Sequence, residues 1–151
     1  MRLAPAVLGY LRAQRTPEPE DVLGEVFLQV ARDLHRFVGD DDALRRWVFT
    51  IAHHRLVDDR RRRRARPQLS GSEPEDVADE RTVDGPPASD PVLRAALLAL
   101  TAEQREVVGL RFVADLSLED VAAITRRTVG AVKSLQGRAL ENLRKAVSQP
   151  A

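Results

Sequence analysis

The sequence predicts an all-α protein built from two small helical domains joined by a flexible acidic linker. Apolar residues recur at spacings of three and four along most of the chain, which is the period of an amphipathic helix. No segment shows the convincing alternation with a period of two that marks a half-buried strand. Aromatic residues make up only 4% of the chain, so burial depends on aliphatic side chains, and this composition favours helices over a sheet sandwich.

Charge and proline content divide the 151 residues into three parts. Residues 1–65 and 92–151 each carry a formal net charge of +3, whereas residues 66–91 carry −5, so the overall +1 is a cancellation. The acidic stretch also holds five of the nine prolines, and such a composition cannot bury enough surface to offset its ordering entropy. We therefore expect one domain over residues 1–66, a linker over 67–91 and a second domain over 92–151. Each domain is small enough to be marginal on its own.

Three helices are expected in the first domain. The first covers residues 3–14. The second begins after Thr16, where prolines and acidic residues favour a helix N-terminus, and its apolar stripe runs over residues 22–37. Residues 39–42 interrupt the pattern and offer a cap. A third stripe starts at Leu44 and continues into the arginine run 60–64, so this helix is expected to end before Pro67.

The second domain is more clearly punctuated by capping residues. Asp90 precedes Pro91 as an N-cap, and capping boxes are predicted over residues 101–104 and 117–120. We expect helices over residues 92–100, 102–113 and 118–124, and a last helix that Thr128 caps and that reaches residue 147. The last two of these helices are joined by a short turn, and the second of them begins with basic residues. Together they form a helix-turn-helix pattern.

Basic residues in both domains point to a nucleic-acid partner. Five consecutive arginines at 60–64 radiate around a helix, and they either stabilise its C-terminus in solvent or bind phosphates. In the last helix, small residues permit close approach to a groove, while Lys133 and Arg138 can reach phosphates or base edges. An ordinary solvated face is the alternative there. The helix-turn-helix pattern favours nucleic acid in both places.

Three residues of the third helix have two interpretations each. Trp47 lies on the apolar stripe and is expected to be a core aromatic, with stacking on an unpaired base as the alternative. His53 and His54 diverge by about 100° on a helix and cannot share one metal ion. We expect both histidines on the polar face, within reach of DNA.

The composition also excludes several classes of protein. The chain has no cysteine, so it contains no disulfide, thiolate metal site or cysteine nucleophile. Phosphate loops, HExxH and GxSxG motifs are absent, so we expect no enzyme activity, no cofactor and no metal. No apolar run approaches the ~18 residues of a membrane span, and no signal peptide is recognisable, so the expected location is the cytoplasm.

Three segments taken in order resemble bacterial RNA polymerase sigma factors of the sigma-70 family, extracytoplasmic-function (ECF) type. The first, residues 20–28, is similar to the family's acidic Asp-(Leu/Val)-x-x-Glu-x-Phe helix. The second, residues 37–61, resembles its Phe-x-Gly…Trp-(Leu/Val)-x-x-Ile-Ala stretch with the following Asp-x-x-Arg signature. The third, residues 97–139, is similar to the helix-turn-helix with its Gly-(Thr/Ala)-Val-Lys-Ser segment.

The resemblance implies regions 2 and 4 of a sigma factor, with three sets of contact residues. Binding to core polymerase, whose expected contacts are the β′ clamp helices and the β flap, is assigned to Asp21, Val22, Glu25, Val26 and Phe27. Recognition of the −10 promoter element is assigned to Arg45, Arg46, Thr50, His53, His54, Asp58, Arg61 and Arg62. Recognition of the −35 element is assigned to Arg126, Arg127, Thr128, Gly130, Ala131, Lys133, Ser134 and Arg138. Promoter DNA and an anti-sigma factor are the other expected partners.

The chain departs from the family pattern at several positions. Gly24 stands where the family usually has Gln, which costs a polymerase contact and about 1 kcal/mol of helix propensity. Arg126 stands where the turn usually has Gly, so a left-handed backbone there would carry strain of order 1 kcal/mol. Leu135 and Gln136 replace Arg-Leu and remove one positive charge. The alternatives to a sigma factor are a stand-alone helix-turn-helix regulator and a general nucleic-acid adaptor.

Overall fold

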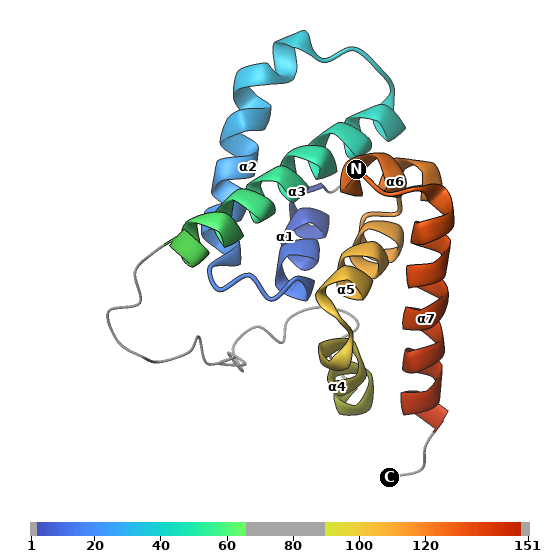
Figure 1. Cartoon of the computed structure of the whole chain (residues 1–151). Helices are drawn as coiled ribbons and strands as arrows, with labels where there is room; N and C mark the ends of the chain where they lie inside the picture. The colour runs from blue at the N-terminus through green and yellow to red at the C-terminus, as the bar shows by residue number, and fades with distance from the viewer. Residues whose placement is uncertain (1–2, 66–89, 149–151) are drawn as a thin grey trace.

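The computed structural model describes residues 3–65 and 90–148, which form helices and no strand (Figure 1). The first half contains α1 (Leu3–Ala13), α2 (Pro19–Asp33), the 3-10 turn η1 (Leu34–Arg36) and α3 (Asp41–Ala65). The second half contains α4 (Pro91–Ala99), α5 (Ala102–Val108), the π-helical turn η4 (Gly109–Val113), α6 (Leu118–Thr125) and α7 (Val129–Ser148). The predicted all-α class is confirmed. The predicted linker lies outside the described residues except for its last two positions.

The predicted caps set the helix boundaries of the second half. The Asp90 carboxylate accepts a hydrogen bond from the backbone N–H of Val92 at 2.9 Å, which begins α4. Thr101 and Gln104 form the reciprocal capping box that begins α5. Ser117 accepts from the N–H of Asp120 at 3.1 Å. These side chains satisfy backbone donors that have no partner within their own helix, and so each helix starts where the sequence predicts.

Two predicted helices end earlier than their apolar stripes suggest. The stripe expected to reach residue 37 gives way at Asp33 to a 3-10 turn, after which Phe37 is extended. The helix expected over residues 102–113 widens at Gly109 into a π turn. A Cβ at Gly109 would lie 2.8 Å from Nε2 of Gln14 and 3.0 Å from Cδ2 of Tyr10. The absence of a side chain therefore lets α1 approach η4.

The two halves pack against each other around one contiguous hydrophobic core. Its fully buried members come from both halves, among them Val7, Tyr10 and Leu11 of α1 with Val107 and Leu110 of the second half. Figure 1 shows α1 between α3 and α5, and α6 beside the first turns of α3. The sequence predicts two marginal domains and gives no sign that each completes the other's core.

No helix in the described part of the chain is long and apolar enough to cross a membrane.

Candidate nucleic-acid interface

The start of α7 presents a polar face to solvent. Thr128 Oγ1 accepts a hydrogen bond from the backbone N–H of Ala131 at 3.1 Å and so caps the helix, as predicted. Arg126 ends α6 with φ 57° and ψ 42°. It therefore adopts the left-handed conformation in which an arginine is expected to carry strain. Seven of the eight residues assigned to the −35 element are exposed: Arg126, Thr128, Gly130, Ala131, Lys133, Ser134 and Arg138.

Arg127 differs from the other residues assigned to the −35 element. Its Nη1 lies 3.4 Å from Oε2 of Glu106 in α5, and only 23% of its side chain is exposed. In this conformation the guanidinium therefore ties the turn to α5 rather than facing solvent.

The residues assigned to the −10 element divide into two groups along α3. His54, Asp58, Arg61 and Arg62 are exposed. Arg46 is exposed as well, although its guanidinium pairs with Asp120 of the second half. Arg45 and His53 are less exposed and lie against Asp115 and Glu106. Thr50 is half-buried, and its hydroxyl donates to the carbonyl of Arg46 at 2.7 Å. The structure thus gathers these side chains on one helix but leaves only part of the set open to solvent.

His53 is buried, and so the expectation that it lies on a polar face is wrong. It is 8% exposed, and Nδ1 lies 3.0 Å from Oε1 of Glu106 without the alignment of a hydrogen bond. Burial lowers the pKa of His53 to about 4, with smaller contributions from the nearby positive groups of His54, Arg60 and Arg127. The ring is therefore neutral at neutral pH.

Glu106 is the acidic centre of the contact between the two halves. Burial raises the pKa of its carboxyl, and the neighbouring Arg127 guanidinium opposes that rise. Because His53 is uncharged at neutral pH, the charge partner of Glu106 is Arg127. Burial raises the pKa of Tyr10, and the Glu106 carboxyl adds to that rise. The Tyr10 hydroxyl has no hydrogen-bond partner among the described residues.

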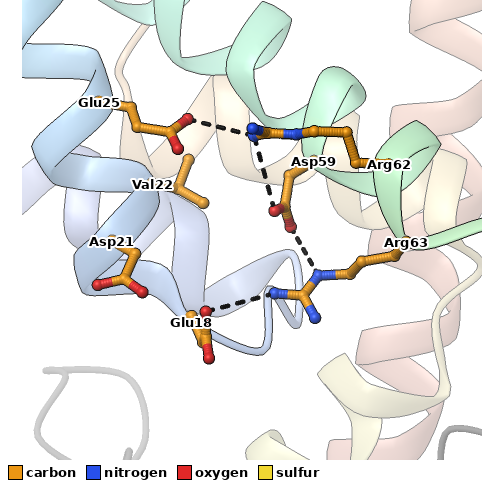
Figure 2. A pocket seen from close by; sticks show the side chains of 7 residues that line it. All are labelled: Glu18, Asp21, Val22, Glu25, Asp59, Arg62 and Arg63. Atoms are coloured by element: carbon orange, nitrogen blue, oxygen red, sulfur yellow. Dashed lines mark hydrogen bonds and ion pairs between the residues drawn. The ribbon is translucent and has the colours of Figure 1, made fainter. Parts of the chain in front are cut away.

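Figure 2 shows how the end of α3 is held to the start of α2 by ion pairs. Arg62 lies 3.3 Å from Glu25 of α2, and Arg63 lies 3.8 Å from Glu18, which precedes α2. Arg63 also pairs with Asp59 of its own helix at 2.9 Å. These contacts engage two of the five consecutive arginines. The guanidinium of Arg60 donates to the backbone carbonyl of residue 14 at 3.3 Å.

The two remaining members of the arginine run, Arg61 and Arg64, are exposed. The run is therefore neither wholly a solvated helix end nor wholly a phosphate clamp.

The acidic helix α2 exposes only part of the surface assigned to polymerase binding. Asp21 is exposed and the side chain of Glu25 is 36% exposed. Val22 and Val26 are 2% and 0% exposed and belong to the core, so they hold the helix in place from within. Phe27 is half-buried against the same core.

Trp47 packs against the core and stacks on Phe37, with 5.3 Å between ring centroids and 21° between ring planes. It is half-buried rather than fully enclosed. This packing favours the interpretation of Trp47 as a core aromatic.

Sequence reasoning missed three acidic residues of the second half that contact α3: Glu106, Asp115 and Asp120. Asp120 resembles an ordinary capping residue, and Asp115 lies in a turn at φ 57°. Glu106 does leave a signal, since it shares a helical stripe with Leu110 and Val113 at spacings of four and seven. An acidic residue on an apolar stripe indicates a buried partner.

Comparison with known proteins identifies the family. Residues 1–66 match the family described as Sigma-70 region 2, and residues 96–145 match Sigma-70, region 4. The ECF RNA polymerase sigma factor SigX of Bacillus subtilis is 31% identical over 136 residues, covering 85% of this chain and 70% of that protein. This chain belongs to the ECF sigma factors. It is accordingly a transcription initiation factor with a DNA-binding helix-turn-helix, and not an enzyme.

Other relatives of this sigma factor agree with the assignment. The ECF sigma factor BldN of Streptomyces coelicolor is 29% identical over 89% of this chain and 52% of its own length. The ECF sigma factor SigC of Mycobacterium tuberculosis is 34% identical over 82% of this chain and 67% of its own length. Among solved structures, the sigma factor RpoE bound to the anti-sigma factor NepR from Bartonella quintana superposes with a TM-score of 0.70. That match covers 99% of this chain and 94% of the other at 22% identity, and it shows the shared fold.

Proposed function

We propose that this sigma factor directs core RNA polymerase to its promoters through three surfaces that lie on separate helices. Exposed Asp21 and part-exposed Glu25 of α2 bind the polymerase β′ clamp helices, with Phe27 supporting them from the core side. The basic and polar residues of α3 bind and open the −10 element. The exposed start of α7 binds the −35 element in the major groove, and the second domain also meets the β flap.

The single observation that carries this proposal is the face of α7. Small and polar side chains alternate with Lys133 and Arg138 on the exposed side of a helix whose N-terminus follows a tight left-handed turn. Such a helix can enter a groove closely and offers donors to phosphates and base edges. The exposed Asp21 and the −10 residues on α3 support the other two contacts.

Run-off transcription with core polymerase tests the proposal. The purified chain is mixed with core enzyme and a pool of genomic promoter fragments, and co-elution with core enzyme is measured in parallel. We expect co-elution and a discrete set of transcripts that core enzyme alone does not make. Co-elution without transcripts, or transcripts without selectivity, would support a general nucleic-acid adaptor, and duplex binding without co-elution would support a stand-alone regulator.

An anti-sigma factor is the natural further partner, and the cytoplasm, where polymerase works, is the proposed location. The RpoE structure named above contains an anti-sigma factor, which supports the expectation of one here. Pull-down from the native host in the uninduced state tests this expectation, since a sigma factor under such control is captured in a stoichiometric complex.

A further inference from the structure

Arg111 of η4 is held in place by three uncharged groups. Its Nε donates a hydrogen bond to Oε1 of Gln136 in α7 at 3.0 Å, and its Nη1 donates to the backbone carbonyl of Leu116 at 2.6 Å. The guanidinium carbon also lies 5.5 Å from the centroid of the Phe112 ring. Within the described part of the chain, Arg111 pairs with no acidic side chain, whereas Arg127 pairs with one. The positive charge of Arg111 is therefore fixed in position but not neutralised by its described neighbours.

The guanidinium of Arg111 keeps donors to spare. A guanidinium carries five N–H groups. The two hydrogen bonds use two of them, so three have no partner among the described residues. Arg111 is half-buried rather than enclosed, and an anion in solvent can reach these donors. A planar set of N–H groups with an intact charge is a good ligand for a phosphate.

The contacts of Arg111 place it between the two helices of the helix-turn-helix. Leu116 directly precedes Ser117, which caps α6, and Gln136 lies one turn after Lys133 in α7. In this motif the second helix lies in the major groove while the first helix crosses the DNA backbone. The corner where η4 meets the start of α6 and the middle of α7 therefore lies beside the backbone that borders the groove.

Gln136 determines how the Arg111 side chain is oriented. An arginine can only donate hydrogen bonds, so the oxygen of the Gln136 amide must face it. The leucine that the family usually has at this position could not accept this bond. An arginine that is already held in one orientation loses less side-chain freedom when it binds a phosphate. The departure at Gln136 thus has a physical consequence for a neighbouring cation.

We propose that Arg111 binds a backbone phosphate of the −35 DNA, and that Gln136 is the positioning residue that orients it. The inference rests on the proposed function, since it adds a contact to the −35 surface assigned there. The residues assigned to that surface lie between positions 126 and 138, whereas Arg111 comes from the preceding helical turn. Gln136 acts through Arg111 and does not itself touch DNA.

Fluorescence anisotropy with the full-length sigma factor tests the phosphate contact. The probe is a labelled duplex that spans the −35 region of a promoter recovered in the run-off experiment. Arg111→Met should weaken binding about ten-fold and lower the salt slope of the affinity by about one unit, because one phosphate contact is lost. Arg144→Met is the matched control, since Arg144 is exposed near the other end of α7, and it should change neither quantity. A wild-type slope in Arg111→Met would overturn the inference.

Arg111→Lys separates the loss of charge from damage to the fold. Lysine keeps the positive charge but lacks the planar set of donors, so this variant should bind more weakly than the wild type and keep the wild-type salt slope. A reduced slope in Arg111→Lys as well would show that both changes act through the fold, and it would overturn the phosphate contact.

A double-mutant cycle tests the positioning role of Gln136. Gln136→Leu should weaken binding to the same duplex about three-fold in the wild-type background, because the guanidinium loses a hydrogen bond that orients it. The same substitution should have no effect in the Arg111→Met background. An equal loss in both backgrounds would show that Gln136 seats α7 directly and would overturn its positioning role.

The wild-type protein distinguishes failure of this inference from failure of the proposed function. Wild-type protein that binds the −35 duplex no more tightly than a scrambled duplex would overturn both. Selective binding by the wild type, together with unchanged binding by Arg111→Met, would overturn the inference and leave the proposed function intact.

Discussion

The surroundings of Gly24 and Gly109 determine the effect that each glycine has on the stability of the protein. Gly24 is an exposed position inside α2, and a Cβ there would meet nothing within 4 Å. Gly109 lies where α1 meets η4, and a Cβ there would press on Tyr10 and Gln14. The sequence identifies Gly24 as a departure from the family pattern, but it cannot reveal the close approach at Gly109, because Tyr10 and Gln14 lie 99 and 95 positions away in the chain.

Substituting each glycine by alanine should therefore change stability in opposite directions. Gly24→Ala should raise the free energy of unfolding by about 0.5–1 kcal/mol, because it removes the backbone entropy cost of glycine in a helix. Gly109→Ala should lower it by about 1–3 kcal/mol through overpacking. Urea denaturation of both variants checks this pair. A destabilising Gly24→Ala would mean that the space beside α2 is occupied.

His53 is the residue whose surroundings differ most from the sequence-based expectation. Its neighbours His54 and Asp58 are exposed, and only the tertiary fold brings Glu106 and Arg127 against it. Sequence periodicity locates His53 on α3 but does not show that another helix covers that side. The buried ring makes His53 a reporter of the packing between the two halves.

The pKa of His53 should be about 4 in the free protein and return towards 6.5 when the halves separate. Because burial between the two halves disfavours the protonated ring, the contribution of His53 to their packing is complete above pH 6.5 and is lost as the pH falls towards 4. Glu106 acts in the opposite sense, since its raised pKa favours the packed halves at lower pH. Arg127 faces the pair from the second half, and His54 and Arg60 face it from α3.

An NMR titration of the three histidine rings in the free protein checks this. A His53 pKa near 6.5 in the free wild-type protein would contradict its burial.

Among the helices, α7 is the one whose role the sequence predicts most fully. Its cap at Thr128 and its exposed polar face are found as expected, and Val132 and Ala139 on its apolar side are buried. Capping and periodicity are local properties, and so a single sequence suffices to predict them. The π turn at η4 is the counterexample, because it depends on the contact with α1.

Lys133→Ala should weaken binding to −35 duplex DNA and lower the salt slope of the affinity by about one unit, since one phosphate contact is lost. Lys145→Ala is the matched control, because Lys145 lies at the other end of α7 and pairs with Glu141 at 3.5 Å. Fluorescence anisotropy over a range of salt concentrations measures both slopes. If the two variants share the wild-type slope, Lys133 does not contact a phosphate.

For the whole molecule, the sequence predicts the fold class, the helices and the family, but not the association of the two halves. Hydrophobic stripes indicate that α1 and α5 bury one face each; they do not indicate that those faces meet. The acidic residues that cover α3 are ordinary surface types until the fold places them. The packing of the two halves is therefore visible only in the tertiary structure.

The distance between the two halves in the free protein tests their packing around one core most directly. Labels at Arg32→Cys in α2 and Asn142→Cys in α7 occupy exposed positions, and no native cysteine competes for them. Pulsed electron paramagnetic resonance measures the distance between the two labels. We predict one narrow, short distance, because the two halves share a hydrophobic core. A broad distribution of distances would contradict this packing.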